Sequence, residues 1–192
     1  MQFQRFLAEE KVEILPRWLD LVYATYPADA VPIFKREKDR FANPIGFNTE
    51  DALNRLYDLL FSGETPDYAG INPVLEHFVK IRAVQTFTPS EAVAFVFFLK
   101  KAVRNRCAKK DAPALTLTEW QEFEEVIDRL AGMVFDLYMA CRERLYQVRV
   151  HEITSMNHMV TRNGCPSAFL DADQSKAAAV NPIHIQSNNE AR

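Results

Sequence analysis

The chain has 192 residues, 48% of them hydrophobic, and a formal net charge of −3. That length and composition allow one domain with a sizeable core. The mild net charge gives no indication of the clustered basic face that a nucleic-acid-binding domain needs. No apolar run approaches the roughly 20 residues that cross a bilayer, and the N-terminus lacks a signal-peptide layout, so we expect a cytoplasmic protein without membrane insertion.

The three cysteines are Cys107, Cys141 and Cys165. Their odd number and wide separation provide neither a disulfide framework nor a paired-cysteine metal site. We therefore expect reduced thiols, as is usual in the cytoplasm. The dipeptide Cys165-Pro166 alone is too weak a signal to assign a redox-sensing or haem-responsive thiol.

The first helical pattern covers residues 3 to 25, where apolar side chains recur at nearly helical spacing. Pro16 should kink or divide this helix near Glu13, because a proline removes a hydrogen bond to the preceding turn. Tyr26-Pro27 should end the helix. Residues 28 to 34 then leave room for only one or two turns.

Residues Lys35 to Phe47 carry mixed charges followed by Asn-Pro and Gly, a pattern typical of an ordered loop. We expect Phe41, Ile45 and Phe47 to pin it as apolar plugs. Two interpretations stay open: a solvated connector, or a binding loop on a rigid scaffold. If the loop binds, its candidate surface residues are Lys35, Arg36, Lys38, Asp39, Phe41 and Asn43.

Two further helices are predicted between residues 48 and 84. Asn48 is expected to cap the first, which ends at Phe61 before the stop signal Ser62-Gly63. A polar stretch then leads to Asn72-Pro73. This pair combines a cap with a proline and predicts the start of a helix that ends near Val84.

The run Thr88-Pro89-Ser90-Glu91 is a compact helix-start signal. Thr88 suits the N-cap, Pro89 the first helical position, and Glu91 can reach back to the cap. The helix should continue to about Lys109. It is apolar on every face from Val93 to Leu99, which in so short a run indicates burial inside a core. Cations in its last turns either complement the helix dipole or form an anion or partner patch.

A long helix is predicted to start at Thr118, with Gln121 completing a capping box, and to meet no breaker before Asn163-Gly164. It would hold about 44 residues and measure roughly 66 Å. A heptad seam runs along its first half: Phe123, Ile127, Leu130, Val134, Leu137 and Cys141. Apolar residues also cover the other faces there, so this half should be packed in the bundle: Val126, Met133, Phe135, Tyr138 and Met139.

Beyond Arg142 the apolar set narrows to a stripe that calls for one partner, either a second subunit or the chain's own tail. We favour a homodimer. The candidate dimer residues are Leu145, Val148, Ile153, Met156 and Val160. The chain thus divides into a helical domain over residues 1–164 and a weakly ordered tail over residues 165–192.

Little in the sequence indicates catalysis. There is no Gly-rich phosphate loop, no nucleophile elbow and no paired-histidine zinc motif, so we predict a non-enzyme without metal or cofactor. The four histidines are His77, His151, His158 and His184. His77 is the one candidate for a lone haem ligand. The alternatives to a regulatory module are therefore a haem- or small-ligand-binding sensor and an accessory subunit of a redox complex.

Three stretches are familiar: Phe34-Lys35-Arg36-Glu37-Lys38-Asp39-Arg40-Phe41-Ala42-Asn43-Pro44-Ile45-Gly46, Arg82-Ala83-Val84-Gln85-Thr86-Phe87-Thr88-Pro89-Ser90-Glu91-Ala92-Val93, and an opening helix with Trp18 that ends at Tyr26-Pro27. Together they resemble the RsbRD N-terminal domain family over about residues 5 to 150. The second stretch adds the candidate surface residues Arg82, Gln85, Phe87 and Glu91. A buried Arg82 should find a carboxylate or carbonyl, and Asp39 or Glu91 is the expected partner in a structural latch.

The resemblance implies an all-α, globin-like input domain without haem, related to RsbT co-antagonists of a bacterial stress-response pathway. It also implies a dimer and a long C-terminal helix that precedes an output module, commonly a STAS domain. Residues 165–192 are too few for such a module. We therefore expect a stand-alone sensory or adaptor form, to which the output module's phosphorylation sites do not carry over.

Overall fold

The structure is a computed structural model that describes residues 2–63, 65–85, 87–113 and 115–162, with side chains from Phe3 to Met156. Within these ranges it is all-α, as predicted, with seven helices and no strand. The chain divides into two units, Met1–Leu145 and Tyr146–Arg192. The predicted boundary at residues 164 and 165, together with Cys165, His184 and the tail, lies outside the described residues.

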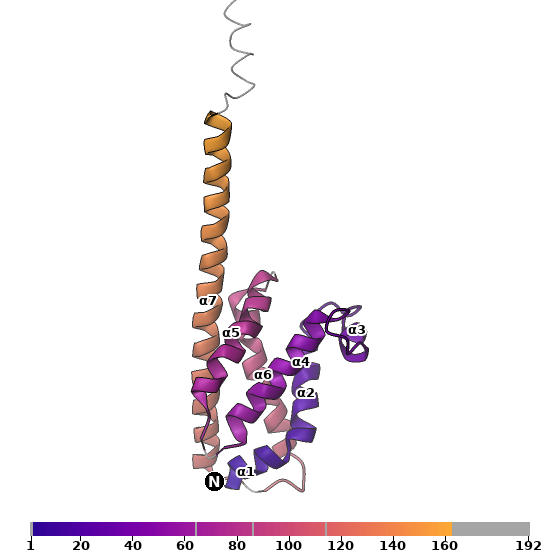
Figure 1. Cartoon of the computed structure of the whole chain (residues 1–192). Helices are drawn as coiled ribbons and strands as arrows, with labels where there is room; N and C mark the ends of the chain where they lie inside the picture. Colours follow the sequence, from indigo (N-terminus) through magenta and orange to yellow (C-terminus); the bar gives the residue numbers. More distant parts are fainter. Residues whose placement is uncertain (1, 64, 86, 114, 163–192) are drawn as a thin grey trace, which may run out of the picture. The chain divides into compact units, whose positions relative to one another are not determined.

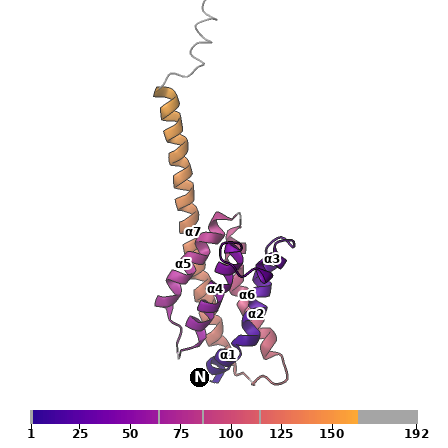
Figure 2. The same ribbon diagram turned by 45° about the vertical axis from the view of Figure 1, so that its right-hand side comes forward.

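The helices follow one another along the first unit as a bundle (Figure 1). α2 packs against α6 and α4, and α5 packs against α4 (Figures 1 and 2). The bounds are α1 Gln2–Glu9, α2 Lys11–Tyr23, α3 Val31–Arg36, α4 Pro44–Phe61, α5 Tyr68–Val84, α6 Pro89–Cys107 and α7 Leu117–Arg162.

The first predicted helix is divided, but at Glu10 and not near Glu13. Pro16 lies inside α2. The break coincides with a tertiary contact, because both carboxylate oxygens of Glu10 accept 2.7 Å hydrogen bonds from Arg106 at the end of α6. Such a bidentate, charge-assisted pair fixes geometry that local sequence does not encode. α2 also ends earlier than predicted, at Tyr23.

The start of α4 corrects the prediction for the Lys35–Phe47 loop. Asn43, not Asn48, is the N-cap, and its side-chain oxygen accepts a 2.9 Å hydrogen bond from the Gly46 amide. The buried Asn43 amide also donates to the carbonyls of Phe34 and Glu37. Phe41 is not a plug, since it is 82% exposed. Hydrogen bonds of the Asn43 side chain therefore hold this loop in place, a role that was predicted for apolar side chains.

Two other helix starts lie earlier than predicted. Asp67 caps α5 by accepting from the Gly70 amide, which leaves Pro73 inside the helix. Before α7, Thr116 and Glu119 bond reciprocally, in place of the predicted Thr118 and Gln121. The other carboxylate oxygen of Glu119 accepts from the Phe3 amide. The capping box of α6, formed by Thr88 and Glu91, is confirmed.

The core centres on α6, where most of the predicted run from Val93 to Leu99 is buried or partly buried. Phe97 is the exception within that run and lies exposed. The indole of Trp18 on α2 donates a 2.7 Å hydrogen bond to the Phe95 carbonyl and stacks on the Phe95 ring. The ring of Phe78 on α5 meets Phe95 edge-on, with centroids 5.1 Å apart. Three helices thus converge on one phenylalanine.

The heptad seam of α7 is confirmed over its first four members, all of which are buried: Phe123, Ile127, Leu130 and Val134. Tyr138 then takes the buried position expected for Leu137. Phe135 and Met139 are exposed, contrary to the prediction that this half is covered on its other faces. Within the described residues, no helix is both long and apolar enough to cross a membrane.

We expect Trp18→Phe to lower the free energy of unfolding by about 1–3 kcal/mol, because it removes a buried hydrogen bond and leaves space beside Phe95. Trp120→Phe is the matched control, since the Trp120 indole is only partly buried and donates to Glu124. Trp120→Phe should lower the free energy of unfolding by less than about 1 kcal/mol. Urea denaturation measures both values, and equal losses would contradict the central role of Trp18.

Candidate functional site

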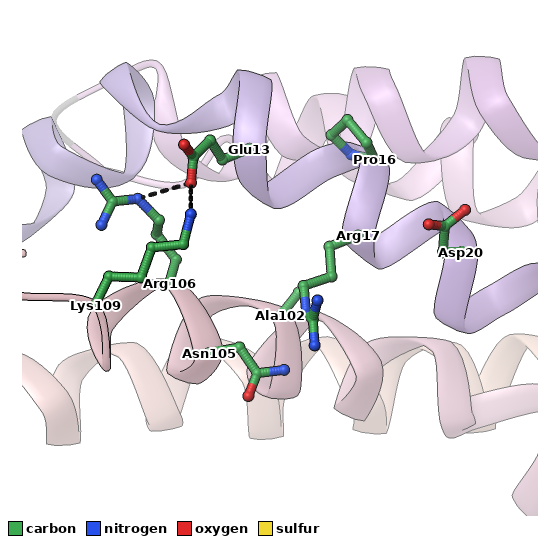
Figure 3. Close-up of a pocket in the computed structure, with 8 residues that line it drawn as sticks. All are labelled: Glu13, Pro16, Arg17, Asp20, Ala102, Asn105, Arg106 and Lys109. Carbon is green, nitrogen blue, oxygen red and sulfur yellow. Dashed lines mark hydrogen bonds and ion pairs between the residues drawn. The ribbon is translucent and has the colours of Figure 1, made fainter.

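A charged groove lies between α2 and α6 (Figure 3). Its volume is about 540 Å³. Its charges largely neutralise one another: Glu13 forms ion pairs with both Arg106 and Lys109, and Asp20 pairs with Lys35 at 2.8 Å. The predicted anion patch at the end of α6 is therefore mostly an intramolecular network, in which Lys100 also pairs with Glu124.

The loop candidates of the first motif are scattered. Lys38 pairs with Glu50 at 2.6 Å beside a second hollow of about 490 Å³. The Asp39 carboxylate accepts from the amides of Phe41 and Ala42, in a local turn. Lys35 turns toward Asp20, and Arg36 and Phe41 are exposed. The structure does not bring these side chains to a common centre.

The candidates of the second motif do share a centre, which is Arg82 on α5. Its side chain is 0% exposed. One terminal nitrogen donates a 3.0 Å hydrogen bond to the main-chain carbonyl of Glu91, and the other donates to the Tyr26 hydroxyl at 3.4 Å. The guanidinium carbon lies 4.0 Å from the centroid of the Phe87 ring, an arrangement that favours cation–π attraction.

Of the two expected kinds of partner, a carboxylate or a carbonyl, the guanidinium finds the carbonyl of Glu91, and aromatic rings surround it. Besides Phe87, the rings of Tyr26, Phe78 and Phe95 lie within 6.0 Å of it. Within the described part of the chain, no carboxylate forms an ion pair with Arg82. Asp39 is therefore wrong as its partner, and Glu91 contributes its carbonyl instead of its carboxylate. Burial lowers the pKa of the guanidinium from its ordinary value, against the opposing influence of Tyr26.

The three familiar stretches meet at this cluster through aromatic contacts. The Tyr26 ring meets Phe34 of the first motif edge-on at 5.1 Å and Phe87 of the second motif edge-on at 5.3 Å. The Tyr26 hydroxyl also donates to Gln85. Sequence reasoning missed Tyr26, which it assigned only as a helix end. Its place beside Pro27 in a familiar stretch was the one available signal.

α7 also holds the connection between α5 and α6. The Tyr138 hydroxyl donates to the Phe87 carbonyl, and Arg142 donates to the Ala83 carbonyl at 3.2 Å. A third hollow, of about 310 Å³, opens beside the residues around Arg82. Its walls are Thr25, Tyr26, Pro27, Gln85, Phe87 and Glu91. The cluster of Tyr26, Arg82, Gln85, Phe87 and Glu91, called the Arg82 cluster below, is our candidate site.

The histidines do not form a cofactor site among the described residues. His77 is exposed, faces Asn48 at 3.2 Å and lines none of the three hollows. His151 is exposed as well, and the side chains of His158 and His184 lie outside the description. No group of three potential metal ligands occurs in the described ranges.

The Arg82 cluster predicts an unusual stability effect. Because the buried guanidinium has no carboxylate partner, Arg82→Met should change the free energy of unfolding by less than about 1 kcal/mol, or raise it, since methionine packs well among aromatic rings. Arg106→Met is the matched control, because it strips Glu10 of a bidentate partner and should destabilise clearly. If Arg82→Met costs as much as Arg106→Met in urea denaturation, Arg82 is a structural latch.

Glu91 predicts an acid-dependent stability. Hydrogen bonds from the Thr88 amide and hydroxyl hold the pKa of the Glu91 carboxyl below its ordinary value of 4.5. A carboxylate of lowered pKa stabilises the fold above that value, and the contribution is lost as the pH falls through the folded-state pKa. The stability gap between the wild type and Glu91→Gln should therefore narrow from about pH 6 to about pH 3 in thermal melts. Glu125→Gln, at an exposed position of α7, is the control, and the same pH trend there would contradict the assignment.

One family model matches the chain. It describes the RsbT co-antagonist protein rsbRD N-terminal domain and covers residues 12–153, a span that includes the whole Arg82 cluster. No curated protein and no solved structure matches the chain, so the globin-like part of the predicted fold stays a prediction. The match covers well over half of the sequence, and its span is close to that of the predicted resemblance. The chain therefore belongs to the RsbRD N-terminal domain family.

Proposed function

We propose that this protein is a non-catalytic, cytoplasmic regulatory module of a bacterial stress-signalling pathway, which acts through a homodimer and a protein partner. The observation that carries the proposal is the family match over residues 12–153, because the family is that of an RsbT co-antagonist N-terminal domain. The Arg82 cluster is its input side, since the stretches that carry the resemblance converge there.

The output side is α7. In the second unit its described apolar side chains are all exposed: Tyr146, Val148, Val150, Ile153 and Met156. Exposed apolar residues in such number on one helix indicate a surface that a partner covers. In the first unit, Phe135 and Met139 of the same helix are exposed as well.

The dimer stripe differs from the one predicted from sequence. Leu145 packs against the bundle core, so it is withdrawn. Tyr146, Val150 and Ile153 are spaced by four and three residues, which places them on one helix face about 60° wide. Met156 flanks that face, whereas Val148 points about 140° away from Ile153. The side chain of Val160 lies outside the described residues.

A pair of substitutions tests the homodimer. Ile153→Asp places a charge in the centre of the proposed stripe and should convert a dimer to a monomer, because burying an unpaired carboxylate is costly. Val148→Asp adds the same charge to an equally apolar position of α7 on another face, and should remain dimeric. Sedimentation equilibrium over a range of protein concentrations measures both.

Three results would contradict the proposal. A wild-type chain that stays monomeric at every concentration excludes the homodimer. A dimer of unchanged affinity in Ile153→Asp shows that the stripe is not the interface, and a monomer in Val148→Asp would assign the contact to the opposite face. Circular dichroism establishes that each variant keeps its helices before its mass is interpreted.

A further inference from the structure

One buried polar atom in the described residues has no hydrogen-bond partner, and it is Nε of Arg82. The guanidinium has five N–H donors, and its hydrogen bonds to Tyr26 and Glu91 come from the terminal nitrogens only. A buried donor without an acceptor costs about 1–3 kcal/mol, and more on a charged group. The fold therefore keeps a cation in its interior with one edge unused and no counter-charge.

The hollow of about 310 Å³ is separated from this cation by a single layer of shared residues. Three of its six wall residues are the groups that touch the guanidinium: Tyr26 through its hydroxyl, Glu91 through its carbonyl, and Phe87 through its ring. The half-buried Phe87 ring thus contacts both the hollow and the cation. A ligand in the hollow reaches the guanidinium only if this wall, and the Phe87 ring in particular, moves aside.

The rim of the hollow carries the opposite charge. Glu91 is exposed, and its capping bonds with Thr88 use only one carboxylate oxygen, Oε2. Its Oε1 accepts no hydrogen bond within the described part of the chain. A simple anion would be repelled by this carboxylate, whereas a ligand that also carries a cation would find a partner for each of its charges.

We propose that the hollow binds a small α-amino acid, whose carboxylate meets the Arg82 guanidinium and whose ammonium group meets Glu91 Oε1. Arginine binds carboxylates in a planar, two-pronged geometry, for which Nε and one terminal nitrogen form a suitable edge. Gln85 at the rim contributes an amide, and Tyr26, Pro27 and Phe87 provide apolar wall. A volume of about 310 Å³ has room for a small amino acid.

The probes are the free amino acids, with acetate and ethylammonium as single-charge controls. Titration calorimetry measures binding to the full chain, and the ¹H–¹⁵N signal of Arg82 Nε, assigned by its disappearance in Arg82→Met, reports contact with the guanidinium. We expect at least one amino acid to bind and to shift that signal. Acetate and ethylammonium should bind several-fold more weakly, because each satisfies only one of the two charges.

Two variants locate the contacts. Arg82→Met should abolish binding. Glu91→Gln retains the capping bonds and should weaken the amino acid several-fold while it strengthens acetate, because the repelling carboxylate is gone. Glu125→Gln is the matched control and should bind like the wild type. If Arg82→Met fails to fold, the titrations of Glu91→Gln with the amino acid and with acetate decide the question.

The site is wrong if no amino acid binds, if acetate binds as well as the best amino acid, or if binding leaves the Arg82 Nε signal in place. Unchanged affinity in folded Arg82→Met overturns it as well. Ligand binding and dimerisation have separate readouts, so a dimer that binds no amino acid removes this site and leaves the regulatory dimer standing. A monomeric chain that binds an amino acid would remove the regulatory dimer and leave this site standing.

Discussion

The hydrogen bond from the Trp18 indole to the Phe95 carbonyl positions the elements on which everything else in the bundle depends. It joins α2 to the middle of α6, while the Phe78 ring attaches α5 to the same phenylalanine. Arg82 lies one helical turn beyond Phe78, and its guanidinium therefore sits over the rings of both Phe78 and Phe95. The environment of the buried cation is a product of how these three helices pack.

Such an environment is unusual for arginine, which proteins rarely bury without a carboxylate. Here the faces of four aromatic rings provide the compensation, together with one carbonyl and one hydroxyl. These groups attract the cation but leave its net charge uncancelled. Arg106 offers the contrast within the same bundle, since it is nearly as buried yet is met by Glu10 and Asp111. Arg106 is therefore paired with carboxylates, whereas Arg82 has no carboxylate partner among the described residues.

The sequence predicted features that depend on local spacing. The Thr88–Glu91 capping box, the buried run of α6 and the first half of the α7 seam all follow from residues a few positions apart. Three helix starts were misplaced because each region offers two caps, and distant contacts choose between them. Asn43 wins over Asn48 because its amide reaches Phe34, and Glu119 completes the cap of α7 because it also binds the Phe3 amide.

The candidate site was predicted only in part for the same reason. Arg82, Gln85, Phe87 and Glu91 are neighbours in the sequence, so one motif contained them. Tyr26 is 56 residues from Arg82, and no periodicity connects the two. That aromatic rings and not a carboxylate would surround the guanidinium was likewise outside the reach of spacing arguments, because it depends on how α2, α5 and α6 cross.

The bonds from Tyr138 and Arg142 to the carbonyls of Phe87 and Ala83 make the first half of α7 part of the bundle. A chain shortened before Tyr138 would leave both acceptors without their donors and open the core beside Val134. The bundle is complete only when α7 is retained through Arg142. Transplanting this module into another protein therefore means carrying the first half of α7 with it, so the junction must lie inside a helix and not in a loop.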